Sequence, residues 1–189
     1  MTEQQRYQVL QRQGSVELRL YEACTVADVV VHGSQERAGN AAFRPLIGYI
    51  SGNNESSRKL AMTAPVVQER VSERLAMTAP VIQEATDDDS WTVSFVLPGG
   101  RPLDEYPKPT DPRVSLRQVP EHAAAALQWS GRWTEANVAR RTHELEQAIA
   151  AAGWTPRGVA RWARFDPPWK PAFARRNEIV MPVTAHDQP

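Results

Sequence analysis

The stretch of residues 157–176 carries the side chains best suited to binding a ligand. It contains six basic residues and a single acid, Asp166. The basic residues are Arg157, Arg161, Arg164, Lys170, Arg175 and Arg176, and the interleaved aromatic residues are Trp162, Phe165, Trp169 and Phe173. Because rings stack on flat molecules and cations pair with negative groups, this composition suits a planar anionic ligand. It would also suit single-stranded nucleic acid, or a solvated basic face above buried aromatic residues.

Sequence motifs for catalysis are lacking. We find no nucleophile motif, no metal ligands paired at helical spacing and no glycine loop that would cradle a phosphate. This pattern argues against a conventional enzyme. Glu178 lies in the stretch RRNEI, close after Arg175 and Arg176. A single carboxylate beside Arg175 and Arg176 is more often part of a structural ion pair.

A first helix is expected from Ser34 to about Ile50, because Gly33 ends the preceding strand and Ser34 can cap the helix. At about 100° per residue, its apolar residues form two sets. The sets are Ala38, Ala42, Pro45 and Tyr49, and then Phe43, Leu46, Ile47 and Ile50. The first set is enough to pack the helix on a sheet. The second set either packs under another loop or lines an apolar ligand groove.

The remaining pattern indicates strands and a second helix, from Thr134 to about Ala152. Two or three strands are expected within residues 7–31, and further strands at 59–68, 74–83, 91–97, 113–119, 123–129, 158–165 and 177–183. The stretch VVVHGSQERAGN before the first helix resembles LQWSGRWTEAN before the second. We therefore expect one α+β domain, residues 1–189, built from two similar strand-helix-strand units at about 7–98 and 113–183, with residues 184–189 as a frayed tail.

The chain also contains an almost unchanged repeat. Residues 60–67 return as residues 75–82, fifteen positions later. This period is shorter than the repeats of about 20 residues or more that build solenoids. In strand geometry Met62 and Met77 lie on the apolar face of each copy. A hairpin of the two copies would place Met62 opposite Val81, and both apolar faces would then fill the interior of the sheet.

The composition indicates which partners and which cellular compartment the protein can have. The 189 residues include 22 basic and 22 acidic ones, so net charge gives no general attraction to nucleic acid or to an anionic membrane. The single cysteine, Cys24, excludes an internal disulfide or a multi-cysteine metal site and fits a reducing compartment. No stretch reaches the roughly 18 apolar residues of a membrane span, and the first residues do not resemble a signal peptide. We expect a cytoplasmic monomer or small oligomer.

Several motifs together resemble the SOUL haem-binding protein family. They are YISGNN, LAMTAPV, WTVSFVLP, PKPTDPRV, SGRW and FDPPWKPAFARRNEIVMPV, and the resemblance runs from about residue 7 to residue 183. It implies a distorted antiparallel β-barrel with two helices. The barrel would be a pseudo-twofold pair of units similar to the gyrase-inhibitor-like effector-binding domains. It further implies binding of a tetrapyrrole, either haem b or free porphyrin.

The resemblance also implies where the ligand binds, in a groove between the first helix and the late loop DPPWKP. The helix would contribute Phe43, Ile47 and Ile50, and the late segment would contribute Arg164, Phe165, Lys170 and Phe173. This placement agrees with the second apolar set of the helix and with the basic aromatic stretch.

The sequence departs from the family at one position. Some members carry a histidine, within an Arg-His-Tyr stretch of the second strand, that has been taken as the iron ligand. Here the matching residues are Arg19, Leu20 and Tyr21, and leucine cannot coordinate iron. The protein therefore holds haem without that ligand, uses another residue, or binds an iron-free tetrapyrrole.

Other residues could ligate haem iron, which takes histidine, methionine, cysteine thiolate or tyrosine. We place His32 first because it precedes the glycine break at the head of the first helix, although a plain surface histidine is the alternative. His122, His143 and His186 are expected to be exposed, and Cys24 to be a buried, inert thiol. Met62, Met77, Tyr21 and Tyr49 remain open candidates.

These observations favour a carrier or buffer of haem or another tetrapyrrole. Burial of the macrocycle would supply most of the affinity, and Arg164 and Lys170 would pair with its carboxylates. The first alternative is a small-molecule hydrolase or effector-binding domain of the gyrase-inhibitor-like type, with Glu178 as general base. The second alternative is a protein-interaction module that uses the exposed apolar face of the first helix.

Overall fold

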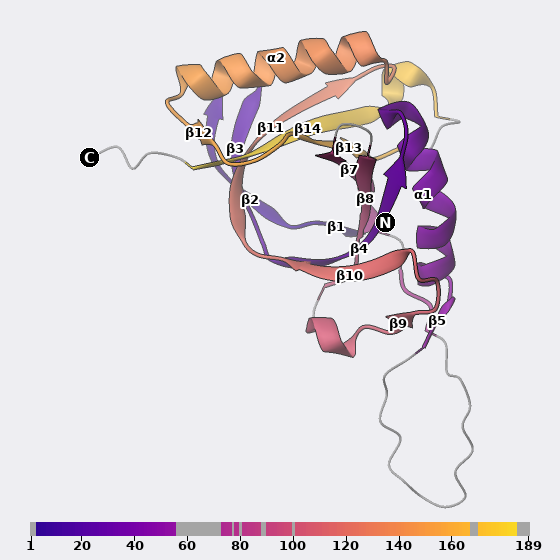
Figure 1. Ribbon diagram of the computed structural model, residues 1–189. Helices are drawn as coiled ribbons and strands as arrows, with labels where there is room; N and C mark the ends of the chain where they lie inside the picture. The colour runs from indigo at the N-terminus through magenta and orange to yellow at the C-terminus, as the bar shows by residue number, and fades with distance from the viewer. Residues whose placement is uncertain are drawn as a thin grey trace, which may run out of the picture.

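The computed structural model describes residues 3–55, 73–76, 78–79, 81–87, 90–99, 101–166 and 170–184 (Figure 1). In these ranges the helices are α1 (Gln35–Ile50) and α2 (Glu135–Ala151), with short 3-10 helices η1 (Leu103–Glu105) and η2 (Ala172–Ala174). The strands are β1 (Glu3–Gln4), β2 (Tyr7–Gln13), β3 (Val16–Tyr21), β4 (Cys24–His32), β5 (Asn54–Glu55), β6 (Thr78–Ala79), β7 (Val81–Asp87), β8 (Ser90–Val96), β9 (Lys108–Pro109), β10 (Val114–Val119), β11 (His122–Ser130), β12 (Thr155–Pro156), β13 (Arg161–Arg164) and β14 (Arg176–Thr184). None of the described helices has the length and apolar character needed to cross a membrane.

One large curled sheet organises the fold. Its strands follow the order β10-β4-β8-β7-β13-β14-β11-β3-β2, and each pairing along this path is antiparallel. β12 adds to β14, while β1 with β6 and β5 with β9 form separate two-stranded sheets. The predicted α+β class, with a curled antiparallel sheet and two helices, is confirmed.

The sheet has a pseudo-twofold arrangement about the β7–β13 pairing. The set β4-α1-β7-β8 on one side matches β11-α2-β13-β14 on the other. Each set is completed by a strand from the other half of the sequence, since β10 pairs with β4 and β3 pairs with β11. Gly33 and Gly131 stand at equivalent places before the two helices, with φ of 116° and 128°. These positive values favour glycine, which lacks the Cβ that clashes there.

Both helices pack on the outer face of the curled sheet, as Figure 1 shows. In α1 the first apolar set packs on the sheet together with Leu46 and Ile50 of the second set, and Ala42 and Leu46 are fully buried against β4 and β8. In α2, Leu145 and Ile149 pack on β11 and β14. Thr134 caps α2 by accepting a hydrogen bond at 3.3 Å from the third residue of that helix. The predicted extents of both helices agree with the structure.

The second copy of the repeat lies partly in strands. β7 begins at Val81 and pairs with β8 on one edge and with β13 on the other, so Val81 lies opposite Phe95 of β8. The predicted pairing of Met62 with Val81 is therefore wrong, because both edges of β7 are already occupied. Met62, Met77 and the first copy, residues 60–67, lie outside the described residues.

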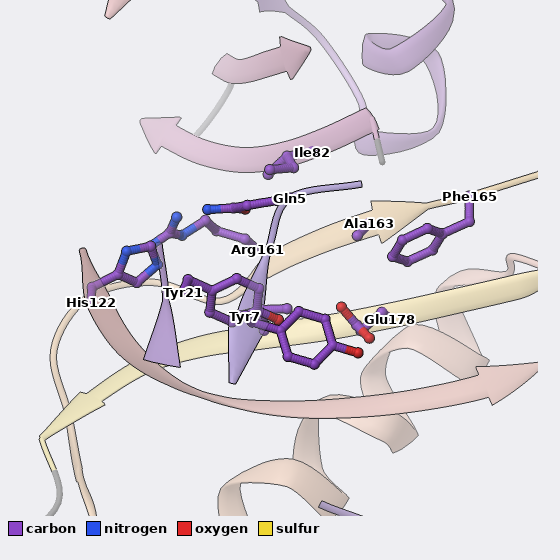
Figure 2. Close-up of a pocket in the computed structure, with 10 residues that line it drawn as sticks. Gln5, Tyr7, Tyr21, Ile82, His122, Arg161, Ala163, Phe165 and Glu178 are labelled. Atoms are coloured by element: carbon purple, nitrogen blue, oxygen red, sulfur yellow. The ribbon is translucent and has the colours of Figure 1, made fainter. Parts of the chain in front are cut away.

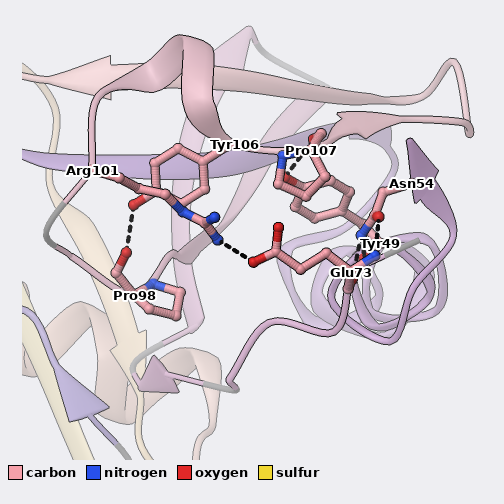
Figure 3. A network of polar contacts seen from close by, with 7 residues as sticks. All are labelled: Tyr49, Asn54, Glu73, Pro98, Arg101, Tyr106 and Pro107. Atoms are coloured by element: carbon pink, nitrogen blue, oxygen red, sulfur yellow. Dashed lines mark hydrogen bonds and ion pairs between the residues drawn. The ribbon is translucent and has the colours of Figure 1, made fainter. Parts of the chain in front are cut away.

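A buried asparagine joins the chain segments on the two sides of residues 56–72. The side-chain amide of Asn54 donates to the carbonyl oxygens of Tyr49 and Glu73, both at 2.8 Å (Figure 3). Its Oδ1 accepts from the backbone N–H of Glu73 at 2.9 Å. The Glu73 carboxylate in turn accepts from Arg101 at 2.9 Å. We call the contacts of Asn54 with Tyr49 and Glu73 the Asn54 clasp.

Candidate functional site

Polar side chains gather on the inner face of the sheet, opposite the helices. Side chains alternate between the two faces of a strand. In β3, Leu18 therefore packs in the core under α2, while Arg19 and Tyr21 point to the inner face. In β14, in the same way, Ile179 packs in that core and Glu178 points to the inner face. The curl of the sheet brings these residues together.

Arg19 and Glu178 form a buried ion pair on this face. Arg19 Nη1 donates to Glu178 Oε2 at 2.8 Å, and the two side chains are 3% and 6% exposed. The same nitrogen donates to the Tyr21 hydroxyl at 2.9 Å. β11 runs between the two strands and carries Ala124 and Ala126 on this face, both fully buried. Their small side chains let the two long ones meet above the strand.

Burial sets the protonation of this group. It raises the pKa of the Glu178 carboxyl, and the neighbouring Arg19 guanidinium acts in the opposite direction without cancelling the rise. Burial also raises the pKa of the Tyr21 phenol. Burial alone would lower the pKa of Arg19, but the oxygens of Tyr21 and Glu178 outweigh it and the pKa lies above its ordinary value. The group therefore holds a fixed cation and a phenol that stays protonated.

A small cavity adjoins the ion pair on the inner face, and Figure 2 shows the side chains around it. Its lining includes Gln5, Tyr7, Tyr21, Ile82, His122, Arg161, Ala163, Phe165, Glu178 and Val180. The cavity has a volume of about 40 Å³. A single water needs roughly 10–15 Å³ on this measure, so the cavity has room for a few waters at most and is too small for a macrocycle.

A much larger open groove continues from the cavity. Its volume is about 680 Å³, inside the range of roughly 300–1,000 Å³ that ligand sites occupy. Its charged lining is Arg117, Arg157, Arg161 and Glu84, and its apolar lining includes Val119, Pro120, Val159, Pro182 and Val183. We call it the arginine groove. The cavity and the arginine groove share His122 and Arg161.

The three arginines of the groove differ in their partners. Arg117 Nε donates to the Asp28 carboxylate at 2.7 Å. Arg157 pairs with no carboxylate among the described residues. Arg161 Nε is buried without a hydrogen-bond acceptor in the described part of the chain, and the Glu84 carboxylate lies 4.0 Å away. The groove therefore carries excess positive charge and N–H groups that can still donate to an anionic ligand.

His122 stands where the cavity and the arginine groove meet. It is the first residue of β11 and lies opposite Tyr21 of β3, and the two rings stack with centroids 5.6 Å apart. Its Nδ1 lies 2.9 Å from the carbonyl oxygen of Pro120, and its Nε2 lies 3.4 Å from a terminal nitrogen of Arg161. Burial lowers the pKa of His122, and Arg161 adds to the effect. The imidazole is therefore neutral near pH 7.

The structure places the helix residues of the predicted groove on and under α1. Phe43 is 45% exposed, and its ring lies edge-on to that of Phe95 at 5.8 Å. Ile47 is half-buried, whereas Ile50 is 4% exposed and belongs to the core beneath the helix. The described linings of the cavity and of the arginine groove include none of these three.

The late-segment residues of the predicted groove have separate surroundings. Phe165 lines the small cavity. Lys170 forms an ion pair with Asp166 at 2.6 Å, so its charge is already compensated. Phe173 is 81% exposed. Arg164 ends β13, and its side chain is not among those that the structure describes.

The candidate iron ligands lie in different parts of the molecule. His32 is exposed at the end of β4, apart from the described linings of cavity and groove. Leu20 lies on the face of β3 that Leu18 gives to the α2 core, so a side chain at this position points away from the cavity. Burial raises the pKa of the Cys24 thiol, which therefore stays protonated. His143 is exposed on α2, Tyr49 is buried, and His186, Met62 and Met77 lie outside the described residues.

Sequence reasoning missed the arginine groove. Arg157 and Arg161 belong to the basic stretch that it singled out, but Arg117 and His122 come from β10 and β11. These strands meet the stretch only through pairings between distant parts of the chain. The run of four alanines after His122 was the available signal, because small residues in a buried strand leave space for other groups.

Comparisons with known proteins agree with the fold. No curated protein matches the chain. Among solved structures, it is similar to the C-terminal domain of EcmrR (TM-score 0.63, 13% identity, 95% of this chain and 99% of that one). It is also similar to a hydrolase from Listeria innocua (TM-score 0.59, 15% identity, 93% and 94%). An uncharacterized conserved protein from Listeria innocua is similar as well (TM-score 0.60, 15% identity, 90% and 92%).

At these identities the likeness to solved structures shows the fold alone. A family match is more specific, because it follows the sequence along nearly the whole chain. Residues 2–182 match the family described as SOUL heme-binding protein. The chain therefore belongs to the SOUL heme-binding protein family.

Proposed function

We propose that this protein binds haem or a related tetrapyrrole and acts as its carrier or buffer. The observation that supports this most directly is the arginine groove in a member of a haem-binding family. Haem b and protoporphyrin are flat apolar rings that carry two carboxylates. An open hollow of about 680 Å³ with apolar walls and three arginines is complementary to such a ligand.

The residues of the arginine groove fit the group that the family implies. Arg157 is exposed and has N–H groups that can donate to a carboxylate, and Arg161 adds positive charge to the same lining. Val159 and Pro182 offer apolar surface to the ring, and Val159 is 47% exposed. When bound, haem would supply an iron centre able to accept a nitrogen ligand.

The predicted groove between α1 and the late segment, called the α1 surface below, is a second proposed place for the ring. Phe43 and Phe173 support it, because both are large apolar side chains exposed to solvent. Ile50 and Lys170 support it less, since one is buried in the core and the other is paired with Asp166. We place the ring in the arginine groove and treat the α1 surface as the competing site.

The openness of the arginine groove suits a carrier. The inner cavity is too small for the ring, so the ligand would stay in the outer hollow with one edge toward solvent. Release then requires no unfolding of the sheet. A buffer needs the same property, because it must exchange its ligand with other proteins.

The test is a titration of the purified protein with ferric haem and with iron-free protoporphyrin, followed by the Soret band. Arg157→Glu should weaken binding of both ligands about tenfold or more, because a hydrogen bond to a charged group contributes about 1.5–3 kcal/mol. Arg140→Glu, on the exposed side of α2, is the matched control and should bind like the wild type.

The double variant Phe43→Asp with Ile47→Asp tests the competing surface. If this variant loses binding while Arg157→Glu keeps it, the ring binds on α1 and the assignment to the arginine groove is wrong. If the wild-type protein binds neither ligand, the proposed function itself is contradicted.

The position and the raised pKa of Glu178 favour a hydrolase as the alternative function. Its carboxyl lies in the cavity wall with a pKa raised by burial, as a general base requires. The hydrogen bond from Arg19 at 2.8 Å works against that role, because it stabilises the carboxylate. Hydrolysis of ester or lactone substrates that Glu178→Gln abolishes would favour the enzyme. An interaction module would instead bind a protein partner through α1 without competition from haem.

A further inference from the structure

The backbone holds His122 rigidly at the head of the arginine groove. β11 begins at this residue, and its pairing with β3 sets His122 opposite Tyr21. The two rings stack with an interplanar angle of 15°, so the imidazole plane is fixed by a neighbour that is itself buried. A ligand side chain held in this way needs little reorganisation to bind.

The hydrogen bond at Nδ1 fixes which nitrogen carries the proton. The partner of Nδ1 is the carbonyl oxygen of Pro120, at 2.9 Å, and a carbonyl can only accept. The proton therefore sits on Nδ1, and Nε2 carries the lone pair. Metal-binding histidines in proteins use this arrangement, because the outer hydrogen bond orients the ring and raises its basicity.

Nε2 lies beside Arg161, whose side chain lines both the cavity and the arginine groove. The contact of Nε2 with a terminal nitrogen of Arg161, at 3.4 Å, is long. The carboxylate of Glu84 lies 4.0 Å from Arg161 Nε, so a small shift of the guanidinium would complete that ion pair and uncover Nε2. Meanwhile Arg157, which has no carboxylate partner among the described residues, is left for a ligand carboxylate.

We infer that Nε2 of His122 is the nitrogen ligand for the iron of a tetrapyrrole bound in the arginine groove. This inference rests on the proposed function. It would explain how the iron is ligated although Leu20 stands where some family members carry a histidine. The side chain at position 20 points toward the α2 core, whereas His122, on the neighbouring strand, lines the groove. The neutral state of the imidazole near pH 7 is the state that binds iron.

The other candidates suit iron less well. His32 is exposed and lies apart from the described groove lining. The Tyr21 hydroxyl accepts from Arg19, and burial raises the pKa of the phenol, so the phenolate that binds iron is disfavoured. The Cys24 thiol is likewise kept protonated by burial.

The experiment compares ferric haem with iron-free protoporphyrin on three proteins: the wild type, His122→Phe and the control His143→Phe. The wild type and His143→Phe should give a histidine-type haem spectrum. His122→Phe keeps a ring against Tyr21, so it should bind protoporphyrin like the wild type. Its ferric haem affinity should fall at least about tenfold, since loss of even an outer partner of a metal ligand costs about 10–100-fold.

A second variant separates ligation from structure. His122→Gly leaves space for free imidazole, and added imidazole should restore the wild-type haem spectrum. If His122→Phe leaves the spectrum and the affinity unchanged, or if imidazole restores nothing, the inference is overturned while the proposed function stands. If the wild-type protein binds neither haem nor protoporphyrin, both fail together.

Discussion

Arg19 reaches over β11 to Glu178, a residue 159 positions later in the chain, and the nitrogen and oxygen atoms lie 2.8 Å apart. Removing Arg19 would leave the Glu178 carboxylate buried without its hydrogen-bonded cation. We expect Arg19→Met to lower the free energy of unfolding by about 3–5 kcal/mol, the usual effect of breaking a buried pair. The double variant Arg19→Met with Glu178→Gln should recover much of that loss, because residue 178 is then neutral, while Glu17, which accepts from Arg19 Nε at 2.9 Å, keeps its ion pair with Arg12. Urea unfolding followed by circular dichroism measures both.

The control for this pair is Arg12, whose exposed side chain pairs with Glu17, a residue that also accepts from Arg19 Nε at 2.9 Å. Arg12→Met should change the free energy of unfolding by less than about 1 kcal/mol. A single Arg19 variant as stable as the Arg12 variant would show that the buried pair contributes little.

His122 should make stability depend on pH. Its pKa in the folded protein lies below the ordinary value of 6.5, because burial and Arg161 disfavour the imidazolium more than the hydrogen bond to Pro120 and the charge of Glu84 favour it. The unfolded chain therefore takes up the proton first as the pH falls, and stability drops from about pH 6.5 downward until the folded pKa is reached. Unfolding in urea at about pH 7, 6 and 5 should show a steeper loss for the wild type than for His122→Phe.

The exposed His143 on α2 is the comparison, and His143→Phe should keep the steeper wild-type slope. Parallel pH profiles for the wild type and His122→Phe would mean that His122 titrates alike in both states.

Asn54 should be important for stability despite its distance from the cavity. Asn54→Ala removes three hydrogen bonds and leaves the N–H and carbonyl of Glu73 without this partner, while the Tyr49 carbonyl still accepts from the Gly52 N–H at 3.3 Å. At about 1 kcal/mol for each bond, the free energy of unfolding should fall by about 2–3 kcal/mol. The melting temperature should fall by roughly 5–10 °C for a chain of this size.

Asn40, exposed on α1, provides the control, since Asn40→Ala should not lower the melting temperature. An Asn54→Ala protein that melts with the wild type would show that water replaces the clasp at no cost.

The two glycines before the helices should respond alike to substitution. Gly33→Ala and Gly131→Ala force a Cβ into positive φ of 116° and 128°. Each should cost about 1–2 kcal/mol, as left-handed backbone does for other residues. Gly99 has no neighbouring atom within 4 Å of a built Cβ and no positive φ, so Gly99→Ala is the neutral control. Unequal losses at Gly33 and Gly131 would show that the two halves do not hold their helices alike.

Local patterns predicted the helices and most strands, because capping residues and apolar periodicity act over short distances. The helix that Thr134 caps ends at Ala151, within one residue of the prediction. The pairing of β10 with β4 was not predictable from such patterns, since it joins residues about 90 positions apart, such as Arg117 and Asp28. The hairpin of the two repeat copies failed for the same reason. Similar sequences do not dictate pairing, and Val81 pairs with Phe95 instead.

The residues of the candidate site were likewise predictable only where they follow one another in the sequence. The basic aromatic stretch contributes Arg157 and Arg161, but His122 comes from another strand and was expected to be exposed. Its half-buried position results from the turn at Pro120 and from the stack on Tyr21. Both depend on how β10, β11 and β3 meet in three dimensions.

The Asn54 clasp has an evolutionary consequence. It binds backbone atoms of Glu73 and so accepts almost any residue at that position, while residues 56–72 contain one full fifteen-residue period of the repeat. Lengthening a connection between fixed ends costs little, about 0.6 kcal/mol for each doubling. A tandem duplication of LAMTAPV between Asn54 and Glu73 changes neither partner of these hydrogen bonds, so the described contacts of Asn54 do not depend on how many copies the sequence carries.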